Sequence, residues 1–295
     1  MTQTSKKWLK RLTARLAEFL PSEEAAAEAR EIAYVCLSLT PARLMMDEPL
    51  LLAKEQEDAI ALVIEGRKDG IPLAYLLKEK EFYGESFFVQ PGVLIPRDDT
   101  TLLCDAALAF LSKCPAPLSL RGGYPVQVWD LCAGSGCVGL TLAKNAPLAF
   151  VHLLEKETAA FETLEENSRR FGLPNIALHR ADLFDAPLPG KESVSLIVSN
   201  PPYIPTGDLA GLQKEVQKEP ETALDGGADG LCFYRGILDC WMPCLRPGGG
   251  LYVEIGYDQG ESVPALFAAA GLKNVTLLQD TNGCDRVVFG QKAEV

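Results

Sequence analysis

The stretch VQVWDLCAGSG, residues 126–136, determines the fold expected for this chain. Residues 126–131 are mostly apolar and β-branched, which favours a buried strand. The turn that follows contains Gly134 and Gly136, which let the backbone approach a ligand and open a helix whose amide groups point at it. The helix is expected to continue to about Lys144. A strand, a glycine turn and a helix in this order are typical of a nucleoside-binding unit.

Strands and helices continue to alternate after this unit. Four further strands are predicted from apolar runs, at 150–154, 176–179, 195–198 and 250–255. Helices are predicted at 158–171, 231–245 and 262–270. Two last β-rich runs, 275–279 and 286–289, have no helix between them, which indicates an antiparallel pair at a sheet edge. We therefore predict an α/β fold with a doubly wound, mostly parallel, seven-stranded Rossmann-like sheet, whose ligands bind at the carboxyl ends of the strands.

The first part of the chain has a different pattern. Residues 1–80 are predicted to form helices with no strand among them, so we expect a small all-helical domain. At 81–97, two β-rich runs flank Gln90-Pro91-Gly92, which predicts a β-hairpin with its turn at that site. The expected division is a helical domain at 1–80, a connector with the hairpin at 81–110, and the α/β domain at 111–295.

Charge and cysteine content argue against several kinds of protein. The chain has 295 residues and a formal net charge of −12. Residues 1–80 contain 12 basic and 13 acidic side chains, so the other residues carry −11 of that charge. Because domains that bind a phosphate backbone are usually basic, we expect no direct nucleic-acid binding. The nine cysteines are odd in number and form no C-x-x-C pair, which argues against a disulfide framework or a metal site.

The sequence also gives an expectation for the cellular compartment. No apolar run approaches the roughly 18–20 residues that span a bilayer. The basic residues near the start are not followed by the apolar region of a signal peptide. We therefore expect a cytoplasmic protein with no membrane partner.

Acidic residues at strand ends indicate which nucleoside the glycine turn binds. Glu155 ends the second strand, 19 residues after Gly136, and can accept hydrogen bonds from both ribose hydroxyls. Asp130 ends the first strand and suits a cationic amino-acid tail. Cys132 occupies the first glycine position of a dinucleotide motif, and the turn offers no Lys or Arg for a pyrophosphate, so S-adenosylmethionine is favoured over NAD. Asp182, after the third strand, either contacts the adenine amino group or is a helix cap or solvated loop acid.

The loop Asn200-Pro201-Pro202-Tyr203, after the fourth strand, is suited to hold a flat NH2 group. The Asn200 oxygen can accept one N–H, and a carbonyl of the stiff proline pair can accept the other. The Tyr203 ring can stack on a conjugated group. Two acceptors orient a poorly nucleophilic nitrogen and stabilise the positive charge that develops during methyl transfer. By itself the loop leaves adenine and glutamine equally plausible as methyl acceptors. The alternative interpretation of the loop is a rigid proline-rich turn without a catalytic role.

A wider set of motifs accompanies these two loops. They are Leu94-Ile95-Pro96-Arg97 with Thr100, Glu219-Pro220 with Ala223-Leu224, Gly226-Gly227, Asp229-Gly230-Leu231, Pro247-Gly248-Gly249, Glu254-Ile255-Gly256 and Gly283 with Asp285-Arg286. With the helical first domain, the set resembles the HemK/PrmC family, the peptide chain release factor glutamine methyltransferases.

The resemblance implies a class I methyltransferase fold, a substrate and a set of site residues. The implied reaction methylates the amide nitrogen of the glutamine in the Gly-Gly-Gln motif of release factors, and S-adenosyl-L-homocysteine is the product. The catalytic and substrate-binding residues it implies are Asn200, Pro201, Pro202 and Tyr203, with Arg97 from the connector. The cofactor-binding residues it implies are Asp130, Cys132, Ala133, Gly134, Ser135, Gly136, Glu155, Asp182, Leu183 and Asn200.

The chain departs from the family pattern at a few positions. The family usually has Gly at Cys132, Thr at Ala133 and Trp at Leu183, and the residues after Arg97 differ from its Pro-Glu-Thr-Glu. The nitrogen-holding loop is unchanged. We expect a monomer that acts on release factors. The alternative substrates are a glutamine of a ribosomal protein and adenine in nucleic acid, and the alternative to an enzyme is a binding module without catalysis. The helical domain either binds the release factor or stabilises the fold.

Overall fold

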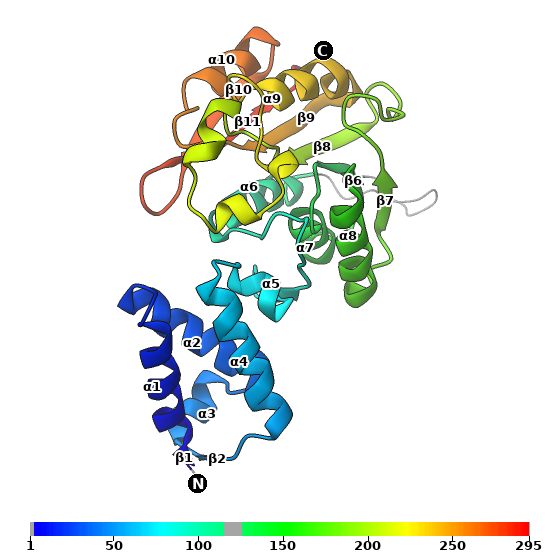
Figure 1. The fold of residues 1–295 in the computed structure, drawn as a ribbon. Helices are drawn as coiled ribbons and strands as arrows, with labels where there is room; N and C mark the ends of the chain where they lie inside the picture. Colours follow the sequence, from blue (N-terminus) through cyan, green and yellow to red (C-terminus); the bar gives the residue numbers. More distant parts are fainter. Residues whose placement is uncertain (1–2, 115–125, 295) are drawn as a thin grey trace. The chain divides into compact units, whose positions relative to one another are not determined.

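The computed structural model describes residues 3–114 and 126–294. They form two compact units (Figure 1). The helical unit comprises Met1–Lys80 together with Lys214–Lys218, and the α/β unit comprises Glu81–Gln213 and Glu219–Val295.

Five helices build the helical unit: α1 Ser5–Leu16, α2 Ser22–Leu37, α3 Pro41–Met46, α4 Lys54–Lys68 and α5 Leu73–Leu77. Trp8, Leu12 and Leu16 recur every fourth residue, so they share one face of α1 and are buried in a common core with α2 and α4. The expectation that this part holds no strand was wrong, because β1 Gln3–Thr4 pairs with β2 Pro49–Leu50. Each of these strands is two residues long, too short to give a periodic signal.

A buried arginine connects separate segments of the helical unit. The Arg67 side chain is fully buried. It donates to Glu28 at 2.6 Å, to Glu215 at 2.9 Å and to the Ile71 carbonyl at 2.8 Å. Glu215 lies in the segment Lys214–Lys218, which the sequence places after the nitrogen-holding loop. The ion pair therefore attaches a part of that long loop to the helices.

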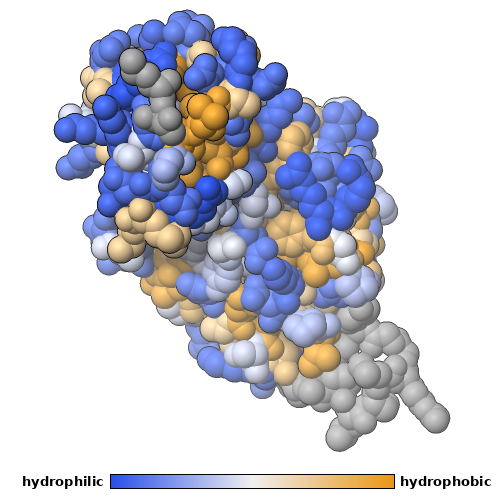
Figure 2. All heavy atoms as spheres, turned by 90° about the horizontal axis from the view of Figure 1, so that it is seen from below, coloured by the Kyte–Doolittle hydropathy of each residue, from blue (hydrophilic) through white to orange (hydrophobic). Residues whose placement is uncertain are grey.

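Several large apolar side chains of the helical unit are exposed. They are Tyr34, Met45, Met46, Leu51 and Leu62, of which Met45 and Leu51 are 79% and 80% exposed. Figure 2 shows hydrophobic residues in separate patches among hydrophilic ones on the face that it draws.

The α/β unit is built on a seven-stranded sheet with the order β10-β11-β9-β8-β5-β6-β7. Its strands are β5 Val126–Leu131, β6 Ala149–Glu155, β7 Ile176–Arg180, β8 Val194–Ser199, β9 Leu245–Glu254, β10 Lys273–Gln279 and β11 Asp285–Gln291. Strands β5 to β9 are parallel, whereas β11 runs antiparallel to both β9 and β10. The predicted fold class and its antiparallel edge are confirmed.

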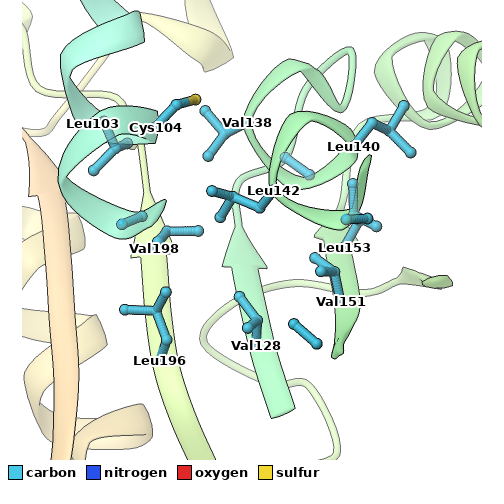
Figure 3. Packing of buried hydrophobic residues seen from close by; sticks show 14 of the residues in the cluster. Leu103, Cys104, Val128, Val138, Leu140, Leu142, Val151, Leu153, Leu196 and Val198 are labelled. Atoms are coloured by element: carbon cyan, nitrogen blue, oxygen red, sulfur yellow. The ribbon is translucent and has the colours of Figure 1, made fainter. Parts of the chain in front are cut away.

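Helices cover both faces of this sheet. One face packs against α6 Thr101–Leu111, α7 Cys137–Asn145 and α8 Thr158–Phe171. Figure 3 shows Leu103 of α6 and Leu142 of α7 facing Val128 and Val198 of the sheet. The other face packs against α10 Ser262–Ala269 and against the helical segment formed by α9 Cys232–Gly236, a π-helical turn at Ile237–Trp241 and a 3-10 turn at Met242–Cys244. Alternate residues of the central strands thus enter opposite cores, which buries the sheet on both faces.

The connector has a hairpin, but its turn is not the predicted one. Strands β3 Lys80–Phe82 and β4 Glu85–Phe87 flank Tyr83 and Gly84, which both have positive φ. The second β-rich run is not a strand. At the end of the first run, Asn167 of α8 accepts the amide of Phe88 at 2.7 Å and donates to its carbonyl at 3.0 Å. A side chain therefore takes the place of a partner strand, and Pro91-Gly92 lies in the chain that leads on to the Arg97 motif.

Candidate active site

A cavity of about 310 Å³ opens at the carboxyl ends of the parallel strands of the α/β unit. The predicted residues that line it are Arg97, Asp130, Cys132, Ala133, Gly134, Ser135, Glu155, Asp182, Leu183, Asn200 and Pro202. Three predicted residues, Gly136, Pro201 and Tyr203, do not line it. The structure thus brings the glycine turn, the connector motif and the nitrogen-holding loop to one place.

The glycine turn is fixed by the two acidic residues beside it. Gly136 is the N-cap of α7 with φ 83°, and a Cβ there would meet Leu164 Cδ1 at 2.5 Å. It shapes the turn from behind the cavity. Asp130 is 1% exposed and its Oδ2 accepts the Gly139 amide at 2.8 Å. Burial raises the pKa of Asp130 to about 8. The hydrogen bond from Gly139 acts against this shift, and the nearby Glu155 charge adds to it.

Glu155 accepts three backbone amides in this structure. Oε1 accepts those of Lys156 and Glu157, both at 2.8 Å, and Oε2 accepts that of Gly134 at 2.8 Å. A carboxylate has about four acceptor positions, so one remains, on Oε2. The prediction that Glu155 accepts both ribose hydroxyls therefore requires the Gly134 amide to move away. Burial is the largest cause that raises the pKa of Glu155, and the three amides lower it.

Asp182 combines a structural contact with a place at the cavity. Its Oδ1 accepts the Phe184 amide at 3.0 Å, a contact within a turn, whereas the alternative was a helix cap or a solvated loop acid. Its Oδ2 lies 3.1 Å from Lys156 Nζ. Burial raises the pKa of Asp182, but the Phe184 amide and Lys156 outweigh it, so the pKa is lowered. The neighbouring apolar wall consists of Leu183, Phe184 and Phe233, with the two phenyl rings 5.5 Å apart.

The charges around the cavity favour a cationic ligand. Five lining residues are acidic and two are basic. The basic ones already have acidic partners, since Lys156 pairs with Asp182 and Arg97 pairs with Glu219. Asp130 and Glu155 accept only backbone amides among the hydrogen bonds recorded for the described residues. Two carboxyl groups therefore face the cavity without a cation.

The nitrogen-holding loop is clamped by the glycine-rich segment that follows it. The amide of Ile204 donates to the Leu224 carbonyl at 2.9 Å, and the Gly226 amide donates back to Ile204 at 2.8 Å. A Cβ on Gly226 would meet the Tyr203 Cα at 2.7 Å, and one on Gly230 would meet the Tyr203 oxygen at 2.4 Å. Only glycine permits this approach, so the segment holds the loop rigidly.

Asn200 and Tyr203 are held by hydrogen bonds to side chains of other segments. The Asn200 Nδ2 donates to the Thr100 hydroxyl at 3.3 Å, and Thr100 is 1% exposed. The Tyr203 hydroxyl donates to Glu254 Oε1 at 3.5 Å, so its side chain is directed to the end of β9. Gln259 fixes the Tyr203 carbonyl at 3.0 Å.

Arg97 is held at the cavity by an acidic residue from another segment. The Glu219 side chain is 2% exposed and pairs with the Arg97 guanidinium. The same carboxylate accepts the Ile95 amide at 3.0 Å. One buried acid therefore fixes both the backbone and the cation of the connector motif.

Comparison with known proteins covers both units of the chain. Residues 7–77 match the PrmC N-terminal domain, and residues 108–226 match the methyltransferase small domain. The chain is 39% identical over 270 residues to the "Release factor glutamine methyltransferase" of Geobacter sulfurreducens, covering 91% of this chain and 90% of that protein. The chain belongs to the release factor glutamine methyltransferase family.

Other members of the release factor glutamine methyltransferase family match similarly. The protein of that name from Moorella thermoacetica is 39% identical over 258 residues, which cover 84% of this chain and 87% of that protein. Among solved structures, the hMettl16 catalytic domain in complex with MAT2A 3'UTR hairpin 6 has a TM-score of 0.53 and 13% identity, covering 83% of this chain and 85% of that chain. This structural similarity shows the fold alone.

Four residues that contact the site were not identified as functional from the sequence. Thr100, Glu219 and Glu254 belong to motifs quoted for the resemblance but received no role, and Gln259 belongs to none of those motifs. Their contribution depends on contacts between residues at least 51 positions apart in the chain, such as Glu254 with Tyr203 and Glu219 with Ile95. Among the described residues, no group of three or more His, Cys, Asp or Glu side chains could hold a metal ion.

Proposed function

We propose that the protein transfers a methyl group from S-adenosylmethionine to the side-chain amide nitrogen of the glutamine in the Gly-Gly-Gln motif of peptide chain release factors. One observation carries the proposal: Asn200 lines the cavity beside the glycine turn while its amino group is bonded to Thr100. Its carbonyl oxygen is then left to accept an N–H of the substrate. Membership of the release factor glutamine methyltransferase family supports glutamine over adenine as the acceptor.

The residues present fit the proposed cofactor. Asp130 is a buried acid at the cavity without a cationic partner, and Glu155 keeps one acceptor position on Oε2. We infer that Asp130 holds the cationic amino-acid tail, that Glu155 holds the ribose, and that Leu183, Phe184 and Asp182 contact the adenine. When bound, S-adenosylmethionine supplies an electrophilic methyl group on a cationic sulfur.

The chain's own residues supply orientation and charge stabilisation. Asn200 accepts one N–H of the glutamine amide, and a backbone carbonyl of the proline pair accepts the other. Positive charge develops on the nitrogen as it reacts, so both hydrogen bonds strengthen in the transition state. No side chain needs to act as a strong base, because the proton is acidic once the nitrogen carries the positive charge. Arg97, fixed by Glu219, contacts the polypeptide around the glutamine.

We further propose that the enzyme acts as a monomer in the cytoplasm and binds no nucleic acid directly. The negative charge of residues 81–295 supports the absence of nucleic-acid binding, and the nine free cysteines support the cytoplasmic location. In the part of the chain that the structure describes, no helix has the length and apolarity that a membrane span requires.

The proposal is tested with labelled S-adenosylmethionine and three purified acceptors: a release factor, ribosomal protein and DNA. We expect label in the release factor alone. Preferential labelling of ribosomal protein would move the substrate to another glutamine, and labelling of DNA would contradict the assignment of a protein substrate.

A further inference from the structure

We propose that Gln259 is a positioning residue that fixes the nitrogen-holding loop, residues 200–203, against the glycine-rich segment 226–230. The inference rests on the proposed role of that loop as the holder of the acceptor nitrogen. Gln259 does not line the cavity, so it acts on the reaction through the loop. Its side chain is 5% exposed, and the four hydrogen bonds recorded for it all lie within the α/β unit.

The side-chain amide of Gln259 uses its full hydrogen-bonding capacity. Its Nε2 donates to the Tyr203 carbonyl at 3.0 Å and to the Gly230 carbonyl at 3.2 Å. Its Oε1 accepts the Gly256 amide at 2.9 Å and the Tyr234 hydroxyl at 3.1 Å. A side-chain amide has two donor hydrogens and two acceptor positions, so none remains unused. Because carbonyls can only accept and a backbone amide can only donate, these partners determine which end of the Gln259 amide faces the loop.

The two prolines of the loop make it dependent on contacts from other segments. Pro201 and Pro202 have no backbone N–H, so neither can attach the loop by a donated backbone hydrogen bond. Gln259 holds the carbonyl of Tyr203, the residue directly after the proline pair. The Pro202 carbonyl lies in the planar peptide group that joins it to Tyr203. Fixing the Tyr203 backbone therefore restricts the direction of the carbonyl groups that the acceptor amide meets.

The Gln259 amide also joins the loop to the glycine-rich segment. A Cβ on Gly230 would meet the Tyr203 oxygen at 2.4 Å and Gln259 Nε2 at 2.8 Å, so the two chain segments and the amide are in close contact. Neither the Tyr203 nor the Gly230 oxygen accepts a further hydrogen bond among those recorded for the described residues. Loss of the Gln259 donor therefore leaves two unpaired carbonyl oxygens close together, and their repulsion displaces the loop.

The backbone of Gln259 gives this contact a firm support. Its amide donates to the Gly256 carbonyl at 3.0 Å, and its carbonyl accepts the amide of Val263 in α10 at 3.1 Å. Val263 is fully buried in the core on one face of the sheet. The contact therefore reaches the loop from a turn that is itself attached to the sheet, between β9 and α10.

Two substitutions remove the donation without enlarging the side chain. In Gln259→Glu, the carboxyl group has at most one proton for the two carbonyls, and Gln259→Met has none and adds no buried acid. Asn175→Asp is the matched control, because Asn175 is 3% exposed and its Nδ2 also donates to two backbone carbonyls, those of Ala143 and Ala149, both at 2.9 Å. Asn175 directly precedes β7, whereas the cavity lies at the carboxyl ends of the strands.

Single-turnover methyl transfer to a purified release factor is measured at saturating cofactor, below the unfolding temperatures of all variants. We expect transfer by both Gln259 variants to be about 10- to 100-fold slower, because a misplacement of about 1 Å can cost about 10²-fold in rate. Transfer by Asn175→Asp should stay within about threefold of the wild type, because its contacts do not bear on the loop. In calorimetry, the S-adenosylmethionine affinity of all three variants should stay within about threefold of the wild type, since neither residue lines the cavity.

Backbone hydrogen exchange, followed by mass spectrometry, separates positioning from a general loss of stability. The Ile204 amide donates to the Leu224 carbonyl, and the Gly226 amide donates to the Ile204 carbonyl. These two amides report directly on the attachment of the loop. Both should exchange at least about tenfold faster in the Gln259 variants, because the loop opens locally more often. Their exchange should be unchanged in Asn175→Asp.

Transfer within about threefold of the wild type by both Gln259 variants would overturn the proposal. So would an equal loss of transfer in Asn175→Asp, unchanged exchange of the two loop amides, or a Gln259→Met variant that does not fold, since the residue would then be purely structural. The failure of the proposed function looks different, because the wild type would leave the release factor unlabelled. The exchange measurement needs no substrate and still decides whether Gln259 holds the loop.

Discussion

Replacing Asn200 by alanine removes the acceptor that carries the proposed mechanism. Hydrogen-bonding groups that act on transition-state charge contribute about 10²–10³ in rate when one is removed, equivalent to about 2.7–4 kcal/mol. Asn200 lines the cavity, and its one recorded side-chain contact is the 3.3 Å hydrogen bond to Thr100. We therefore expect single-turnover methyl transfer to fall by about 10²–10³ at saturating cofactor, with cofactor affinity within a few fold.

The same substitution should have a small effect on folding. The lost hydrogen bond to Thr100 contributes about 0.5–1.5 kcal/mol to the free energy of unfolding. Asn145→Ala is a matched control, because Asn145 also donates one side-chain hydrogen bond, to the Thr141 carbonyl at 2.9 Å, and lies outside the cavity lining. It should lose comparable stability and keep full activity. Transfer by Asn200→Ala within about threefold of the wild type would refute the reasoning.

Four further predictions concern the cofactor and the fold. Glu155→Ala should weaken cofactor binding about 10- to 100-fold in calorimetry, because the ribose and the Gly134 turn lose the same carboxylate; unchanged affinity would exclude that contact. Burial raises the pKa of Asp130 to about 8, and Asp130 must ionise to hold a cationic tail, so cofactor affinity should rise with pH up to about 8. Binding should also release protons, which calorimetry detects as a binding enthalpy that depends on the ionisation enthalpy of the buffer. Binding without proton release contradicts this role. Burial lowers the pKa of His152 to about 4, below the 6.5 of the unfolded chain, so its contribution to stability is present above pH 6.5 and lost as pH falls towards 4; His152→Gln should flatten that slope in denaturant titrations. Arg67→Ala leaves the buried Glu28 carboxylate without its cation and should lower the free energy of unfolding of the helical unit by about 3–5 kcal/mol; a loss below about 1 kcal/mol, as for a surface ion pair, would contradict this.

The hydrophobic pattern of the sequence predicted those strands and helices whose bounds depend on neighbouring residues in the chain. Strand β5 at Val126–Leu131 and helix α8 at Thr158–Phe171 begin and end where the sequence predicted. Both are long, strongly patterned segments whose period is set by burial on the sheet. The end of β9 was also predicted closely, but its start at Leu245 was not. The Pro247-Gly248-Gly249 run falls within that strand, and a register shift follows Val194 of its neighbour.

Features that depend on contacts between distant residues were not predicted. The hairpin turn was placed at Pro91-Gly92, although the chain turns at Tyr83 and Gly84. Tyrosine rarely adopts the positive φ that Tyr83 has, so the sequence gives no turn signal there. The β-rich run after it contacts Asn167, 79 residues away.

The site was predicted to the extent that it follows from motifs at strand ends. Parallel strands bring their carboxyl ends to one edge, so Asp130, Glu155 and Asn200 meet at the cavity as expected. Tyr203 was expected to contact the acceptor group, but it does not line the cavity and its hydroxyl donates to Glu254. The burial of Glu254 follows from tertiary packing, which spacing along the chain does not encode.

The position of the transferred methyl group tests the central claim most directly. A release factor is incubated with the protein and S-adenosylmethionine, digested, and analysed by tandem mass spectrometry. The account predicts one added methyl group on the side-chain nitrogen of the Gly-Gly-Gln glutamine, formed about 10²–10³-fold more slowly with Asn200→Ala than with the wild type. A methyl group on any other residue, or an unmodified release factor beside methylated ribosomal protein or nucleic acid, would contradict it.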